Sequence, residues 1–285
     1  MNMLYIRVVS NNMLDEIFKA ITFLGDEVFL LIALPVIYFT RKRLGLKMAL
    51  SVLTGVFISH LLKPIFRVER PPEQYWKVKV SGYSFPSGHA TNAATFWGYA
   101  AYTMRRKIYI AGILGLMVIL IGYSRVYLRV HWWADVVAGW VIGLLIVAIV
   151  EYLDRKFGEQ IDAIKFQFKL IIGFGVPFLV IGLSAAIIGA NVPEFEAILK
   201  ALSALSGIFT GHLIADKAGF SLNDTDNIVT IIIRSIICLI IVMIIYRLYK
   251  ALAFLGVLII VPVFWFFGII VTLITPLIIR ALHRE

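Results

Sequence analysis

Charged residues are scarce in this sequence. Lys, Arg, Asp and Glu make up only 15% of its 285 residues, whereas 61% are hydrophobic and the mean hydropathy is +0.92. A soluble domain of this length carries far more charge, because its surface must be wetted. The apolar residues fall in long runs separated by basic clusters, so the sequence predicts an all-α protein, a polytopic transmembrane helical bundle.

Cysteine is almost absent too. The single cysteine, Cys238, lies within an apolar run, which excludes a disulfide framework and a cysteine-based metal site. The first 20 residues have no uninterrupted apolar core, so no cleavable signal peptide is expected. The net charge of +10 comes largely from Lys and Arg in short loops, where they set membrane orientation. No nucleic-acid partner is therefore expected.

The apolar runs predict eight or nine spans. Five come first, at 28–40, 46–62, 87–104, 108–123 and 132–153, and three follow at 170–190, 228–246 and 251–279. A weaker run at 197–215, interrupted by Lys200 and His212, predicts either a ninth span or an interfacial helix. Residues 11–23 place apolar side chains at three- and four-residue spacing, which favours an amphipathic helix in the interface.

Two domains are expected. Residues 1–157 would form a catalytic membrane core, and residues 158–285 a C-terminal membrane extension to which no motif assigns a role. The extension carries three aspartates, which are expected to lie in a solvated loop: Asp216, Asp224 and Asp226.

Basic clusters follow alternate ends of the first five spans, at 41–43, 105–107 and 154–156. The positive-inside rule assigns these clusters to the cytoplasm of a multi-pass cell-membrane protein. The loops at 63–85 and 124–131 then lie outside, yet they too are rich in Lys and Arg. Basic residues on that side need a reason, and a bound anion would supply one.

Two of these outer segments contain histidine in a chemically suggestive setting. His131 and Asp135 are four residues apart where the fifth span begins, so the carboxylate can orient one ring nitrogen and leave the other free as a nucleophile. The alternative is that His131 and Asp135 only pair with each other at the membrane interface and have no catalytic role. In Pro86-Ser87-Gly88-His89, a helix start with free amides lies beside His89, a potential proton donor.

Three cations complete the pattern: Lys63, Arg70 and Arg125. Each alone is compatible with a contact to lipid headgroups. Together with the two histidines and the helix start they form an inventory for phosphoryl transfer. The outer loops hold no cluster of Asp and Glu for magnesium, so neither a metal nor another cofactor is expected.

The three segments resemble the signature of the type-2 phosphatidic acid phosphatase superfamily. Lys-x6-Arg-Pro begins at Lys63, Pro-Ser-Gly-His at Pro86, and Ser-Arg-x5-His-x3-Asp at Ser124, without substitution. The resemblance covers roughly residues 14–156. It implies a helical bundle in which His131 attacks phosphorus to form a phosphohistidine.

The resemblance also implies the roles of the other residues. Asp135 would orient His131, and His89 would protonate the leaving oxygen. The phosphate-binding residues would be Lys63, Arg70, Ser87, Gly88 and Arg125.

The expected function is hydrolysis of a lipid phosphate or pyrophosphate at the outer face of the bilayer. A polyprenyl pyrophosphate, phosphatidic acid or phosphatidylglycerophosphate would fit, whereas no oligomeric state is indicated. Lipid-dependent phosphoryl transfer to a hydroxyl acceptor is an alternative. An anion-selective transporter is another, although transporters place their charges near the bilayer midplane. The motifs also occur in vanadium haloperoxidases, for which a membrane bundle is a poor setting.

Overall fold

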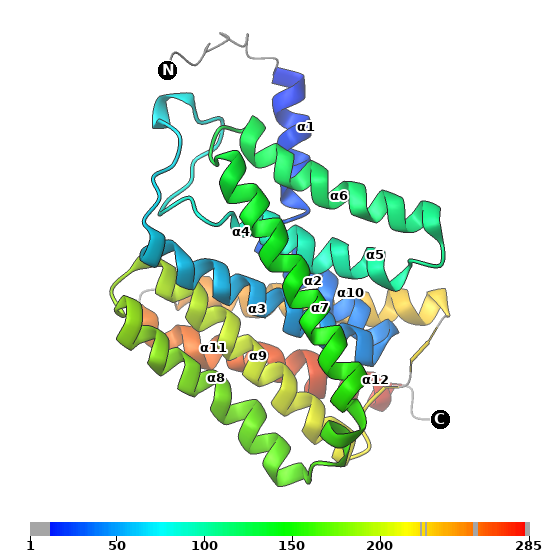
Figure 1. The fold of residues 1–285 in the computed structure, drawn as a ribbon. Helices are drawn as coiled ribbons and strands as arrows, with labels where there is room; N and C mark the ends of the chain where they lie inside the picture. The colour runs from blue at the N-terminus through cyan, green and yellow to red at the C-terminus, as the bar shows by residue number, and fades with distance from the viewer. Residues whose placement is uncertain (1–11, 223, 226, 253–255, 283–285) are drawn as a thin grey trace.

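The computed structural model describes residues 12–222, 224–225, 227–252 and 256–282, and within them every regular element is helical. The helices of the first half are α1 Asn12–Phe23, α2 Glu27–Thr40, α3 Lys42–Phe66, α4 Gly88–Ala93, α5 Tyr99–Thr103, α6 Ile108–Tyr127 and α7 Trp133–Ala163. Those of the second half are α8 Phe166–Ile188, α9 Pro193–Lys217, α10 Ile228–Ala251, α11 Val257–Ile269 and α12 Thr275–Leu282. The predicted all-α membrane bundle is confirmed (Figure 1).

Seven helices in the described residues are long and apolar enough to cross a membrane, or eight if α1 and α2 form one span bent by 46°. The predicted span at 87–104 consists of α4, a π-helical turn at Ala94–Gly98 and α5. Together these three pieces are shorter than any of the seven candidate spans. The weak run at 197–215 lies in α9, a full-length candidate span. Of its most apolar window 67% is buried, more than in any other candidate span, so its polar residues are sheltered by protein.

Several predicted boundaries were wrong. The fourth span was expected to end at 123, but α6 continues to Tyr127, which places Ser124 and Arg125 in its last turn instead of in a loop. The fifth was expected to end at 153, but α7 continues to Ala163 and runs through the expected domain boundary after 157. Charged residues do not end α7, because Asp154 and Asp162 on it pair with Arg43 of α3.

One aspartate of the extension differs from expectation. Asp216 lies in the last turn of α9, not in a loop, and pairs with Lys42 at 3.3 Å. Asp224 lies in an exposed loop as predicted, where it accepts a hydrogen bond from the Lys42 amide. Asp226, like residues 1–11 and 253–255, lies outside the described residues.

The two halves of the chain pack together through α3 and α9. In the first half α3 contacts α2, α4 and α7, and in the second half α9 contacts α8 and α11. Small residues allow the tightest of these contacts: a Cβ on Gly207 would lie 2.0 Å from the Trp265 carbonyl oxygen. Close packing of this kind holds helices together in lipid, where no hydrophobic force drives them together. The extension is thus packed against the first half.

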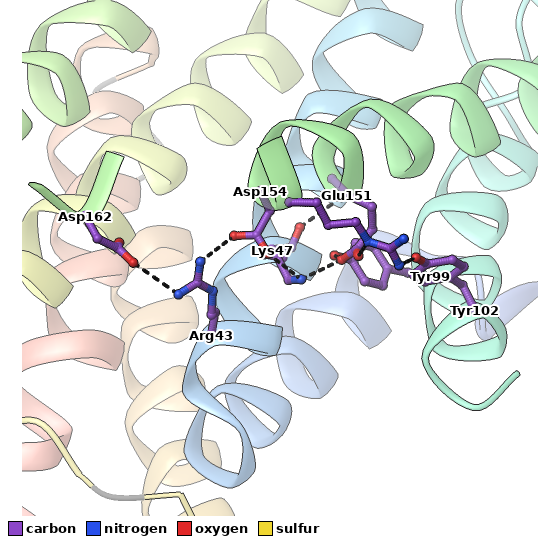
Figure 2. Close-up of polar contacts among 9 residues, drawn as sticks. Arg43, Lys47, Tyr99, Tyr102, Glu151, Asp154 and Asp162 are labelled. Atoms are coloured by element: carbon purple, nitrogen blue, oxygen red, sulfur yellow. Dashed lines mark hydrogen bonds and ion pairs between the residues drawn. The ribbon is translucent and has the colours of Figure 1, made fainter. Parts of the chain in front are cut away.

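One end of the bundle carries a network of ion pairs (Figure 2). Arg43 binds Asp154 and Asp162, and Lys47 lies 2.5 Å from Glu151 and 3.0 Å from Asp154. The network reaches α5 because Tyr99 donates a hydrogen bond to Glu151 and Arg155 donates one to Tyr102. Arg105 also stacks on the Tyr102 ring. All three basic clusters therefore gather at this end, as their spacing predicted.

The opposite end holds the loops expected to carry the site. Its loops are joined by backbone hydrogen bonds from Lys77 to Leu128 and from Ser87 to Asp135. The second bond ties the start of α4 to the first turn of α7. Further along, these helices approach closely at Gly143, where an added Cβ would lie 2.5 Å from the Ala94 Cβ and 2.7 Å from the Thr91 carbonyl oxygen.

Gly143→Ala should therefore destabilise the protein by about 1–3 kcal/mol, the usual cost of overpacking. Gly115→Ala in α6 is the matched control, because nothing lies within 4 Å of a Cβ there. That change should be neutral or stabilising by up to about 1 kcal/mol, since Gly is a poor helix former. Thermal unfolding in detergent measures both variants. Equal melting temperatures would show that α4 and α7 do not depend on this close approach.

Candidate active site

His131 lies in the short connection between α6 and α7, and its side chain is buried, with 4% of the residue exposed. Its Nδ1 is 3.3 Å from Oδ2 of Asp135, so the contact predicted from their spacing is present. The same carboxylate oxygen accepts a hydrogen bond of 2.8 Å from the Trp132 amide and so caps α7. Asp135 is thereby fixed in place by the helix start that it caps.

Arg70 contacts the other ring nitrogen of His131. Its Nη1 lies 3.1 Å from His131 Nε2, and its guanidinium also donates to the carbonyl oxygens of Ser81, Gly82 and Val130, each at 2.9 Å. A guanidinium has donors only and stays protonated, so Nε2 must accept. The hydrogen of a neutral ring then sits on Nδ1 and is donated to Asp135, which leaves the lone pair on Nε2.

The surroundings keep His131 neutral. Burial lowers its pKa well below the ordinary histidine value, and the nearby charges of Arg70, Arg125 and Lys63 lower it further. Burial disfavours the charged ring, and three cations repel it. A ring held neutral by its environment has its nucleophilic nitrogen available at neutral pH.

The Pro-Ser-Gly-His segment starts α4 beside this pair. Ser87 is the N-cap, Gly88 is the first helical residue, and the Ser87 amide donates to the Asp135 carbonyl oxygen at 3.0 Å. Ser87 is fully buried, and its Oγ has no hydrogen-bond partner in the described residues. His89 follows on the first turn, with Nε2 3.6 Å from Oδ2 of Asp26.

The remaining two predicted cations come from helix ends. Lys63 lies in the last turn of α3 and Arg125 in the last turn of α6, and both are buried. Arg125 Nη1 donates to Thr22 Oγ1 at 2.8 Å, whereas its Nε has no partner in the described residues. The structure thus brings all eight predicted residues to one end of the bundle, with unpaired donors that suit an anion.

Sequence reasoning missed three contributors. Asp26 faces His89, Thr22 holds Arg125, and Glu194 of α9 is 6% exposed, with Oε1 2.5 Å from where a Cβ on Gly82 would lie. Gly82 has φ +67° and accepts a hydrogen bond from Arg70, so the extension reaches the loop that holds the site. The sequence could have indicated Asp26, because a carboxylate directly before an apolar run is typical of a helix N-cap. No sequence pattern indicates Glu194.

Within the described part of the chain, no group of three or more His, Cys, Asp or Glu side chains is arranged to hold a metal ion. The donors around His131 are instead guanidinium, ammonium, hydroxyl and imidazole groups. These groups complement an anion with several oxygens.

Comparisons with known proteins agree with this geometry. The pattern of the PAP2 superfamily matches residues 44–159. The chain is 36% identical over 158 residues to phosphatidylglycerophosphatase B of Bacillus subtilis, covering 50% of this chain and 76% of that protein. It is 32% identical over 116 residues to undecaprenyl-diphosphatase of Sulfolobus acidocaldarius, covering 39% of this chain and 55% of that protein.

Among solved structures, the first transmembrane PAP2 type phosphatidylglycerolphosphate phosphatase from Bacillus subtilis is 35% identical and has a TM-score of 0.49, over 52% of this chain and 80% of that one. The superfamily match spans the segment that contains the three motifs, and the expected resemblance is confirmed. The chain belongs to the PAP2 superfamily.

Proposed function

We propose that this protein is a lipid phosphatase that hydrolyses a lipid phosphate or pyrophosphate at the extracytoplasmic face through a phosphohistidine on His131. The arrangement of His131 carries the proposal. Its Nδ1 is oriented by Asp135, and its Nε2 lone pair faces Arg70, a half-buried cation that lies near the buried Lys63 and Arg125. A nucleophile beside preorganised positive charge is what phosphoryl transfer requires.

The first step transfers the phosphoryl group to the protein. Phosphate oxygens draw the Arg70 Nη1 hydrogen bond away from Nε2, and Lys63, Arg125 and the Ser87 hydroxyl bind the same group. The freed Nε2 lone pair forms a bond to phosphorus while the bond from phosphorus to the leaving oxygen breaks. His89 gives that oxygen its proton.

The second step releases phosphate. His89, now neutral, takes a proton from a water molecule as the water oxygen bonds to phosphorus. The bond from phosphorus to Nε2 breaks, which restores neutral His131 and protonated His89. The side-chain cations stabilise the charge on the equatorial oxygens in both steps, so no step requires a metal ion.

The names of the relatives support a polar-lipid substrate. They include phosphatidylglycerophosphatase B, undecaprenyl-diphosphatase and the lipid A 4'-phosphatase of Porphyromonas gingivalis. The three basic clusters lie at the end of the bundle opposite to the site, so the positive-inside rule supports an outward-facing site. Residues 1–157 would then be the catalytic core, with the extension packed against it.

Replacing the nucleophile tests the mechanism. Purified His131→Ala should lose all lipid phosphatase activity, and Asp135→Asn should lose about 10²–10⁴-fold in kcat, since a carboxamide stabilises the wrong tautomer. Gly115→Ala serves as a control because a Cβ at this position contacts nothing within 4 Å. Phosphate release from phosphorylated lipids in detergent is measured. Activity in folded His131→Ala comparable to that of the unsubstituted protein would contradict the mechanism.

The pH dependence follows from the lowered pKa of His131. The nucleophile acts in its neutral form, so on the acid side the activity should fall as the pH drops through that lowered value. The ionisation of the substrate is titrated separately, and the kcat/KM profile is corrected for it. The acid limb that remains should lie below about pH 6.5, the ordinary pKa of histidine. An enzyme limb at or above this pH would mean that burial and the cations do not lower the pKa of His131 as proposed.

Orientation is tested by labelling. Lys79 and Lys107 are both exposed, near opposite ends of the bundle, and Cys238 is buried. In a Cys238→Ser background, an impermeant thiol reagent on intact cells should label Lys79→Cys and not Lys107→Cys. Permeabilised cells should label both. The reverse pattern on intact cells would place the site in the cytoplasm.

A further inference from the structure

His131 is not the only histidine at the site that faces a carboxylate. His89 Nε2 lies 3.6 Å from Asp26 Oδ2, which is within ion-pair range and too long for a hydrogen bond. Asp26 precedes α2 and is the N-cap of that helix, because its Oδ1 accepts a hydrogen bond of 2.8 Å from the Val28 amide. One carboxylate oxygen therefore holds the helix, and the other faces the imidazole.

The turn that carries Asp26 is fixed against α4. Asn92 Nδ2 donates to the Gly25 carbonyl oxygen at 3.3 Å, and Trp97 Nε1 donates to that of Leu24 at 2.9 Å. A Cβ on Gly25 would lie 3.2 Å from the His89 carbonyl oxygen, so the turn and the start of α4 are in close contact. One side chain from α4 and one from the π-helical turn that follows it thus hold the turn beside His89.

The charges around His89 explain why it needs this partner. Arg125 and Lys63 repel a positive charge on its ring, and burial disfavours that charge. A general acid must nevertheless carry a proton that it can release. Asp26 is the carboxylate facing the ring that opposes the two cations.

We propose that Asp26 is a positioning residue for His89: its carboxylate faces Nε2–H at ion-pair distance, stabilises the imidazolium and leaves Nδ1–H to protonate the leaving oxygen. This inference rests on the proposed phosphatase function. In the transfer step the Nδ1–H bond breaks as the O–H bond of the departing lipid alcohol forms. The Nε2–H bond stays intact, so Asp26 itself neither gains nor loses a proton.

The dependence on leaving group distinguishes this role from a structural one. A lipid alcohol leaves poorly unless it is protonated, whereas p-nitrophenolate leaves with little help. The measurement is kcat/KM for dioctanoyl phosphatidic acid and for p-nitrophenyl phosphate, because kcat/KM reports the steps up to release of the alcohol or phenol. The lipid-to-aryl ratio is therefore the readout.

Asp26→Asn is the informative variant, because Asn caps helices as well as Asp but carries no charge. It should lower kcat/KM for the lipid roughly 10–10²-fold, within the worth of general acid catalysis, and for the aryl ester less than about fivefold. His89→Ala should show the same selectivity with a larger loss. Glu27→Gln, which removes a neighbouring charge from the first turn of α2, should leave the ratio unchanged.

Equal losses on both substrates, or none on either, would overturn the role of Asp26. A lowered melting temperature with an unchanged ratio would assign it to helix capping alone. The proposed function fails by a different result: the unsubstituted protein would hydrolyse neither substrate, or His131→Ala would remain active on both.

Discussion

The fold of the site end depends on keeping three cations close together, of which Lys63 and Arg125 are buried and Arg70 is half-buried. Lys63, Arg70 and Arg125 repel one another, and none of them lies within ion-pair distance of a carboxylate in the described residues. Burying like charges is costly unless other groups compensate. Backbone carbonyl oxygens compensate Arg70, and the Thr22 hydroxyl compensates Arg125. The loops of this end must therefore be ordered before any ligand binds.

The opposite end treats its charges differently. There Arg43 and Lys47 are each paired with two carboxylates, and the ion pairs hold α3 and α7 together (Figure 2). Cations with carboxylate partners stabilise helix contacts, whereas cations without them attract an anion. The same residue types thus serve packing at one end and, we propose, phosphate binding at the other. The difference lies in which residues each end supplies as partners.

The close approach of α4 to α7 connects the two histidines of the site. The Ser87 amide bonds to the Asp135 carbonyl oxygen, and Gly143 lets the helices stay in contact farther along. The acid proposed at His89 lies in α4, and the nucleophile proposed at His131 lies in the connection directly before α7, so both are tied to packed helices. Each faces its own carboxylate, Asp135 or Asp26. Groups supported by packed helices are held more precisely than groups on a free loop.

The C-terminal extension contributes a direct contact to the end of the bundle that holds the site. Helix α9 packs against α3, and its first turn places Glu194 against Gly82, next to the loop that holds Arg70. The superfamily match ends at residue 159, so this contact is an addition to the matched region. Glu194 is buried, and it places a carboxylate near the cations. Burial lowers the pKa of Arg70, and the negative charge of Glu194 opposes that lowering.

The sequence by itself determined the class of protein, the candidate site residues and the grouping of the basic clusters, because hydropathy, charge and motif spacing are local properties. The His131–Asp135 contact followed from a four-residue spacing. Tertiary structure alone decided that Arg70 donates to His131 and that Asp26 faces His89, since these partners are far apart in the chain and meet only when helices pack. It also decided where α7 ends, because ion pairs with α3 sustain α7 past its charged residues.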